Sequence, residues 1–275
     1  MIITSAPTST SEAATEYHLT NTRVVRSEWA KFWSLRSSLI TLGAAVLFLV
    51  GIGVVAALLY SPSGPLGDEG ADSGAALTLG LSGTNLAALA IGALGVLISA
   101  GEYSTGMVRS TFASVPTRLP VLWAKCLVFG PVAFVVSTAG ALASFLIGGA
   151  ALSDEAIALS LGDTGVLRCL VGAGLYLSLV GVFGIALGVL VRNSAGGIAI
   201  LAGVVLVLPG LTGMLPSSVR DTVGRFLPSA AGQSIITLHP TAGSMVSPGI
   251  GIATLVAWAV ALLAGAAYLL RRRDI

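Results

Sequence analysis

Residues 101–125 read GEYSTGMVRSTFASVPTRLPVLWAK, a short charged segment between two long apolar runs. The segment has Glu102 as its second residue and carries the cations Arg109, Arg118 and Lys125. Charges inside the hydrocarbon layer of a membrane are costly and rare. The segment therefore predicts a polar connection between two membrane-spanning helices.

The composition of the whole chain supports this prediction. Of its 275 residues, 55% are hydrophobic and only 9% are charged, against about 25% charged in soluble domains. Six charge-free runs each reach the roughly 20 residues that a helix needs to cross a bilayer, and they lack the alternation of barrel strands. The predicted fold is an all-α integral membrane protein with six transmembrane helices, at about residues 39–60, 79–101, 126–150, 169–191, 195–215 and 250–270.

The N-terminal part has a different character. Residues 1–22 are rich in Ser and Thr and predict a disordered cytoplasmic tail, followed by a single membrane domain over residues 23–275. Residues 24–36 predict an amphipathic helix in the membrane interface, with Val25 and Phe32 on its apolar stripe. The alternative is that they form only the positive flank of the first span. The residues assigned to the membrane interface are Arg26, Trp29, Lys31 and Trp33.

The placement of cations predicts the orientation. With a cytoplasmic N-terminus, the inner segments hold eleven of the fourteen Lys and Arg residues, and the outer loops hold only Arg168, Arg220 and Arg225. This distribution follows the positive-inside rule. Six spans then return the C-terminus to the cytoplasm, where the chain ends in RRRDI.

Within the predicted six-span topology, several features of the sequence indicate irregular or closely packed helices. Residues 216–249 contain an apolar stripe that predicts short re-entrant helices before the last span: Val219, Val223, Phe226 and Leu227. Pro131 and Pro209 are expected to kink the third and fifth spans. Gly184 and Gly188 form a GxxxG pair that lets helices approach closely, although it specifies no particular dimer face.

The chain offers little for catalysis or ion coupling. No predicted span has an ionisable residue near its middle, and Glu102 is expected to pair with Arg109 or another nearby cation. Residues 80–83 read GLSG and resemble the serine motif of rhomboid intramembrane proteases, which leaves a Ser82/His239 protease as an alternative. An ion-coupled secondary carrier is a second alternative. No GxxxxGK[ST] motif occurs, so any ATP hydrolysis belongs to a partner.

The charged segment also resembles the cytoplasmic loop of type-2 ABC transporter permeases of actinobacterial type. The resemblance rests on Glu102, Gly106, Arg109, and Pro116 before a basic residue, Arg118. Three other stretches agree with it: SEWAKFWSLRS before the first span, FLPSAAGQSI in the last outer segment, and the closing LLRRRDI. The short outer loop between the first two spans differs from members with large extracellular domains.

This resemblance implies the membrane-spanning subunit of an ATP-driven exporter in the bacterial cell membrane. ATP and Mg²⁺ would be held by partner ATPase subunits, and a second permease subunit would complete a homo- or heterodimer in membrane lipid. No nucleic acid, catalytic residue, cofactor site or metal site is expected in the chain itself. Residues 104–115 would form the coupling helix, and the residues assigned to ATPase coupling are Glu102, Ser104, Met107, Arg109, Phe112 and Arg118.

Overall fold

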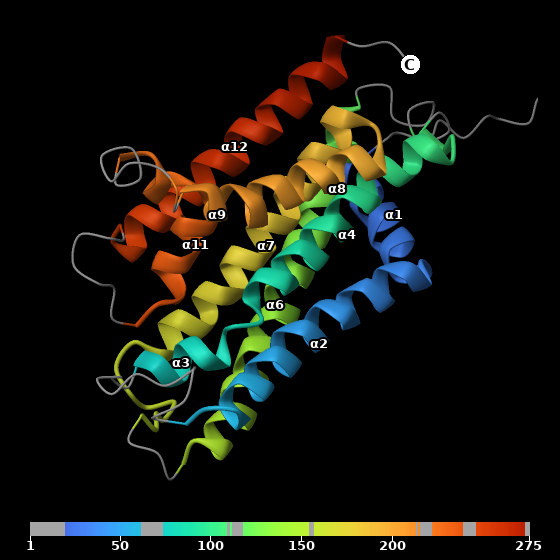
Figure 1. Cartoon of the computed structure of the whole chain (residues 1–275). Helices are drawn as coiled ribbons and strands as arrows, with labels where there is room; N and C mark the ends of the chain where they lie inside the picture. The colour runs from blue at the N-terminus through green and yellow to red at the C-terminus, as the bar shows by residue number, and fades with distance from the viewer. Residues whose placement is uncertain are drawn as a thin grey trace, which may run out of the picture.

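The chain is described by a computed structural model over residues 20–61, 74–108, 111, 118–153, 157–212, 214, 222–238 and 246–272. Within these ranges its regular structure is helical, without a β-strand, and a short helix, α1 (Asn21–Ser34), precedes a bundle of long helices (Figure 1). Six helical stretches are long and apolar enough to cross a membrane, so the chain is a multi-pass helical membrane protein. They are α2 (Arg36–Leu58), α3 (Gly74–Gly80) with α4 (Thr84–Ser104), α6 (Leu119–Ala151), α7 (Val166–Val191), α8 (Ser194–Ala202) with η1 (Gly203–Val207) and α9 (Leu208–Thr212), and α12 (Pro248–Arg272).

The fourth span, α7, lies at the centre of the bundle, between α4 and α6 on one side and α12 on the other (Figure 1). It is the most buried of the six. Its glycines explain how closely α4 approaches: a Cβ atom at Gly184 would lie 3.0 Å from the Val96 nitrogen, and one at Gly188 would lie 2.7 Å from the Val96 oxygen. The GxxxG pair therefore packs α7 against α4 within one chain and does not mark a dimer face.

The second span differs from the prediction, which treated residues 79–101 as one helix. It is interrupted at residues 81–83, between α3 and α4. The interruption lies where the backbone of α2 comes close, because a Cβ atom at Gly83 would lie 2.7 Å from Leu49 Cα. Gly83 thus allows a backbone contact that a larger residue would prevent.

The third span begins earlier than the prediction at residue 126. The helix α6 starts at Leu119, with Pro120 in its first turn, where a missing N–H costs nothing. Lys125 therefore lies inside the helix instead of in the preceding loop. The apolar run alone placed the boundary too late, because it counted Lys125 as an end signal.

The fifth span is irregular next to Pro209, the residue that was expected to kink this span. The segment η1 is a turn of π-helix that directly precedes α9, and Pro209 is the second residue of α9. Proline supplies no N–H to the helical ladder, and π-helical turns are one way to accommodate such a break. Pro131, by contrast, lies inside α6, which continues through it as an α-helix.

A buried short helix precedes the last span, as predicted. The helix α11 (Pro228–Ile236) packs against α7 and α12 after a single 3₁₀ turn, η2 (Gly224–Phe226). Its contacts are close: Gly232 faces the ring of Tyr176, and Gly172 of α7 faces Ile235. The expected stripe did not form one helix, because Leu227 is extended and caps α11, while Val219 lies outside the described residues.

Candidate functional site

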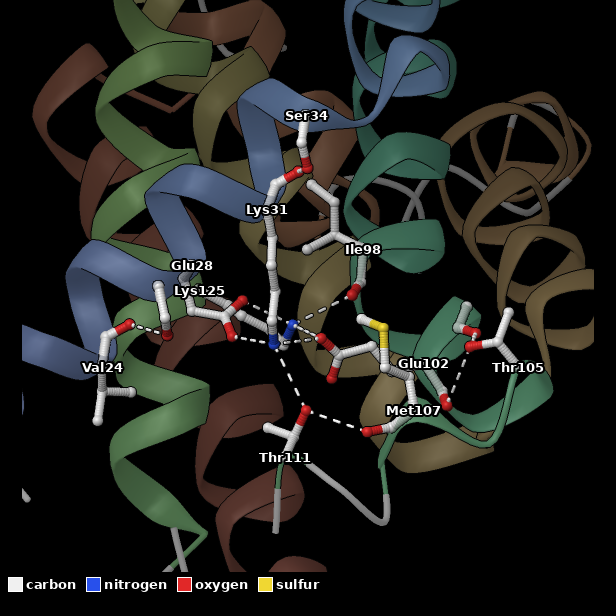
Figure 2. Close-up of polar contacts among 12 residues, drawn as sticks. Val24, Glu28, Lys31, Ser34, Ile98, Glu102, Thr105, Met107, Thr111 and Lys125 are labelled. Carbon is white, nitrogen blue, oxygen red and sulfur yellow. Dashed lines mark hydrogen bonds and ion pairs between the residues drawn. The ribbon is translucent and has the colours of Figure 1, made fainter. Parts of the chain in front are cut away.

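Four charged side chains meet at the end of the bundle formed by α1, the last turn of α4 and the start of α6. We call this set the ion cluster: Glu28 and Lys31 from α1, Glu102 from α4, and Lys125 from α6 (Figure 2). Residues separated by as many as 97 positions in the sequence are thus in direct contact. The cluster links three helices at one point.

Each ammonium group contacts both carboxylates. Lys125 Nζ lies 2.8 Å from Glu28 Oε2 and 2.8 Å from Glu102 Oε1. Lys31 Nζ lies 2.7 Å from Glu28 Oε1 and 3.0 Å from Glu102 Oε1. Lys125 donates its third hydrogen bond to the Ile98 carbonyl at 3.3 Å, so all three of its N–H groups have acceptors.

The cluster is buried and has no net formal charge. The exposed fractions of the Glu28 and Lys31 side chains are 4% and 29%, and those of Lys125 and Glu102 are 5% and 10%. An unpaired charge at such a depth would be strongly unfavourable, and a pair is tolerated only when its hydrogen bonds are satisfied. Glu102 also sits in the last turn of α4, where the helix dipole disfavours a carboxylate, and the two lysines offset that cost.

The pKa values in α1 reflect this pairing. Burial alone would raise the pKa of Glu28, but attraction and hydrogen bonds from Lys125 and Lys31 outweigh it and hold that pKa below its usual value. Burial would likewise lower the pKa of Lys31, but Glu28 and Glu102 hold it above its usual value. Both groups are therefore charged across the neutral range.

The pH dependence of stability follows from these directions. Because the Glu28 pKa is depressed, its contribution is complete above its ordinary pKa of about 4.3 and is lost as the pH falls below it. Because the Lys31 pKa is raised, its contribution is complete below about 10.4 and is lost as the pH rises through the higher folded value. We expect Glu28→Gln to lower the thermal unfolding midpoint at pH 7. The variant should also show a smaller fall of that midpoint between pH 5 and pH 3 than wild type does.

The measurement is thermal unfolding of wild type and variant in an uncharged detergent from pH 3 to pH 7. Asp163→Asn removes a carboxylate outside the cluster, one that accepts a backbone hydrogen bond, and is the control. If the Glu28→Gln curve ran parallel to that of wild type, the Glu28 carboxylate would not carry the acid sensitivity.

One face of α1, which the sequence did not single out, packs on the bundle. Its buried residues are Val24, Glu28 and Phe32, spaced by four, whereas Trp29 and Trp33 are 48% and 46% exposed. Both exposed Trp rings are free to contact the predicted membrane interface, and so is the exposed side chain of Arg26. Lys31 was assigned to the polar face, but its ammonium turns toward the cluster. Glu28 was not predicted from the sequence. The signal for it was its position four residues from each of two apolar residues, Val24 and Phe32, which places all three on one helical face.

The segment that connects α4 to α6 begins next to the ion cluster. Thr105 caps α4, and Gly106 follows with a φ of 73°, a left-handed conformation that ends helices and favours glycine. Lys31 Nζ donates its third hydrogen bond to Thr111 Oγ1 at 3.4 Å, which ties α1 to this connection. Thr111 Oγ1 in turn donates to the Met107 carbonyl at 3.1 Å (Figure 2).

The residues assigned to ATPase coupling lie in different settings. Glu102 is buried in the cluster, whereas Ser104 and Met107 are exposed. Arg118 directly precedes α6 and donates from Nη1 to the Leu270 carbonyl of α12 at 3.4 Å. Arg109 and Phe112 lie outside the described residues. The described members therefore surround one end of the bundle instead of forming a single surface patch.

A cavity of about 380 Å³ adjoins the cluster. Glu28, Lys31, Glu102 and Lys125 contribute to its wall, which is otherwise mainly apolar and includes Leu97, Val128 and Phe129. Such a volume is within the range of ligand-binding pockets.

The protease alternative rests on two residues, of which the structure describes only Ser82. Ser82 lies in the interruption between α3 and α4, and His239, the predicted protease base, lies outside the described residues. No group of three or more His, Cys, Asp or Glu residues suited to a metal ion occurs in the described ranges. No protein-family model matches the chain, and no curated protein matches it either.

Proposed function

We propose that this protein is the membrane-spanning permease subunit of an ATP-driven ABC exporter in a bacterial cell membrane. The observation that carries the proposal is the link from the connection after α4 to three helices. Lys31 contacts Thr111 in that connection and, through Glu28 and Glu102, both α4 and Lys125 of α6. A push on the connection would therefore move α1, α4 and α6 together.

The proposed mechanism follows from that link. ATP and Mg²⁺ are bound by separate cytoplasmic ATPase subunits, which dock on residues 104–115. Closure of the ATPases displaces this segment, and the buried cluster transmits the displacement because breaking it would leave charges unpaired away from water. Two permease copies then rearrange to open a path for an apolar or amphipathic substrate. In this mechanism Glu102 transmits force, and the exposed Ser104 and Met107 contact the ATPase.

The arrangement of the remaining elements supports the same function. A short N-terminal helix with exposed Trp rings, six long apolar helices and a buried short helix before the last span occur in the order that the family resemblance implies. The cation distribution supports a cytoplasmic location for both termini and for the connection after α4, where an ATPase can reach them. Co-purification of this chain with an ATPase that lacks membrane spans is the first expected result.

The coupling step has its own test. In proteoliposomes containing the chain and its ATPase, we expect Thr111→Val to reduce ATP-driven transport about two- to tenfold, as expected for one lost hydrogen bond. Thr111→Ser keeps the hydroxyl and should restore transport. Ser34→Ala removes a hydroxyl that donates to the Lys31 carbonyl on the exposed side of α1, and it should have no effect.

A second variant separates coupling from assembly. Arg109→Glu with Phe112→Ala is expected to abolish both ATPase binding and transport, whereas Thr111→Val should leave the complex intact. Unchanged assembly and transport in the double variant would contradict the coupling assignment. Transport that survives ATP depletion but stops when the ion gradient is collapsed would identify a secondary carrier instead.

A further inference from the structure

A second cavity lies at the opposite end of the bundle from the ion cluster. Its volume is about 190 Å³, and it is a partly open hollow lined by residues of the first turn of α4, the irregular fifth span, η2 and α11. Asn85 marks its position on α4, 17 residues before Glu102, which at 1.5 Å per residue is about 25 Å along the helix. This cavity is therefore distinct from the coupling region.

The start of α11 contributes hydrogen-bond donors that lack an acceptor in the described part of the chain. Leu227 occupies the N-cap and provides no side-chain cap, and the first helical hydrogen bond runs from the Ala231 nitrogen to the Leu227 carbonyl at 2.9 Å. The N–H groups of Ser229 and Ala230 have no acceptor among the described residues, and both residues line the cavity. The positive end of a helix dipole lies at the same point.

The Ser229 side chain provides an independent sign of a missing partner. It is only 5% exposed, it lines the cavity, and its hydroxyl has no hydrogen-bond partner among the described residues. Buried hydroxyl groups in proteins are nearly always hydrogen-bonded, so an unsatisfied one beside a cavity needs an explanation. A ligand that occupies the cavity would satisfy it.

The surrounding groups fix the position of this turn and limit the ligand chemistry. Trp258 of α12 donates from Nε1 to the Phe226 carbonyl at 3.0 Å and so anchors the turn that precedes α11. Asn85 and Gln233 add amide donors to the cavity wall, whereas none of the lining residues is charged. A cation would face the positive end of a helix without a carboxylate to balance it. An oxyanion would find several N–H and O–H donors in the wall of the cavity.

We propose that this cavity binds an anionic phosphate group, held by the first turn of α11, the Ser229 hydroxyl and the amides of Asn85 and Gln233. The volume corresponds to roughly six water molecules at about 30 Å³ each. It therefore accommodates a phosphate head group but not the acyl chains of a lipid. The group comes either from a phospholipid or from free phosphate. The site does not depend on the proposed ATPase coupling.

The test uses the full chain, purified without phospholipid in an alkyl maltoside detergent. In one arm, sodium phosphate is titrated against sodium chloride at equal ionic strength, and the thermal unfolding midpoint is measured. In the other arm, phosphatidylglycerol is compared with diacylglycerol carrying the same chains. We expect saturable stabilisation by phosphate, by phosphatidylglycerol, or by both; stabilisation by phosphatidylglycerol alone would identify the lipid head group as the source.

Two variants and a matched control locate the effect. Ser229→Asp places a carboxylate at the second position of α11, where it suits the helix but repels an oxyanion, and it should raise the half-saturating concentration about tenfold or more. Ser229→Ala should raise it about threefold or more. Ser234→Ala removes a buried hydroxyl of the same helix that is already bonded to the Ala231 carbonyl, and it should leave the half-saturating concentration unchanged.

Two results would overturn the proposal. One is an absence of specific stabilisation of wild type, with phosphate equal to chloride and phosphatidylglycerol equal to diacylglycerol. The other is stabilisation with the same half-saturating concentration in wild type, Ser229→Asp and Ser229→Ala. The wild-type comparison decides the question even if a variant does not fold.

Discussion

Lys125→Met is expected to lower the free energy of unfolding by about 3–5 kcal/mol, the range for removing one partner of a buried ion pair. Lys125 is 5% exposed and contacts both Glu28 and Glu102, so its loss leaves two buried carboxylates with only Lys31 between them. The methionine fills much of the same volume, so the effect reports the lost charge and not a cavity. Unfolding in a mixed-micelle SDS titration measures it.

A double variant and a weaker single variant make this prediction specific. Lys125→Met with Glu102→Gln removes one charge of each sign and keeps the cluster neutral, so it should be less destabilised than Lys125→Met alone. Lys31→Met should cost less than Lys125→Met, because Lys31 is 29% exposed and water can replace part of its contacts. If all three variants were equally destabilised, charge balance would not be the cause.

Gly184→Ala is expected to lower the free energy of unfolding by about 1–3 kcal/mol through overpacking. The added methyl group would meet the Gly92 carbonyl of α4 inside van der Waals contact and would lie 3.0 Å from the Val96 nitrogen. Both are backbone atoms and cannot turn aside as a side chain can. The helices α4 and α7 would have to separate, and the same SDS titration would detect this.

Gly43→Ala is the matched control for this substitution. Gly43 also lies in a membrane helix, α2, but nothing lies within 4 Å of an added Cβ atom. There the alanine should be neutral or stabilising, by up to about 1 kcal/mol of helix propensity. Equal destabilisation at both positions would show that the close α4–α7 contact is not the reason.

Several particular features of the fold could be read from the sequence. The six long apolar runs predicted the six helices, because a chain of this composition can satisfy its backbone in lipid only by forming helices. The re-entrant helix before the last span and the irregularity at Pro209 were also predicted correctly. These features depend on local sequence, since apolar length and proline act within one helix.

The ion cluster depended on contacts between distant parts of the chain. Glu102 was expected to pair with Arg109 or another nearby cation, and its partners are Lys125 and Lys31, the latter 71 residues away. Glu28 was not identified, because the helical period that located the Trp rings says nothing about which side packs on the bundle. The boundary of the third span was wrong for a related reason, since Lys125 looked like a loop residue.

By itself, the sequence determined that the chain is a multi-pass helical membrane protein, because hydropathy is a property of each segment taken alone. Only the tertiary structure decided which charges pair, that Gly184 and Gly188 face α4 of the same chain, and that the Ser229 hydroxyl, beside a cavity, has no partner among the described residues. A charge, a glycine or a hydroxyl has no fixed role until the neighbouring helix is in place. The partner groups then decide whether it is paired, packed or left without a partner.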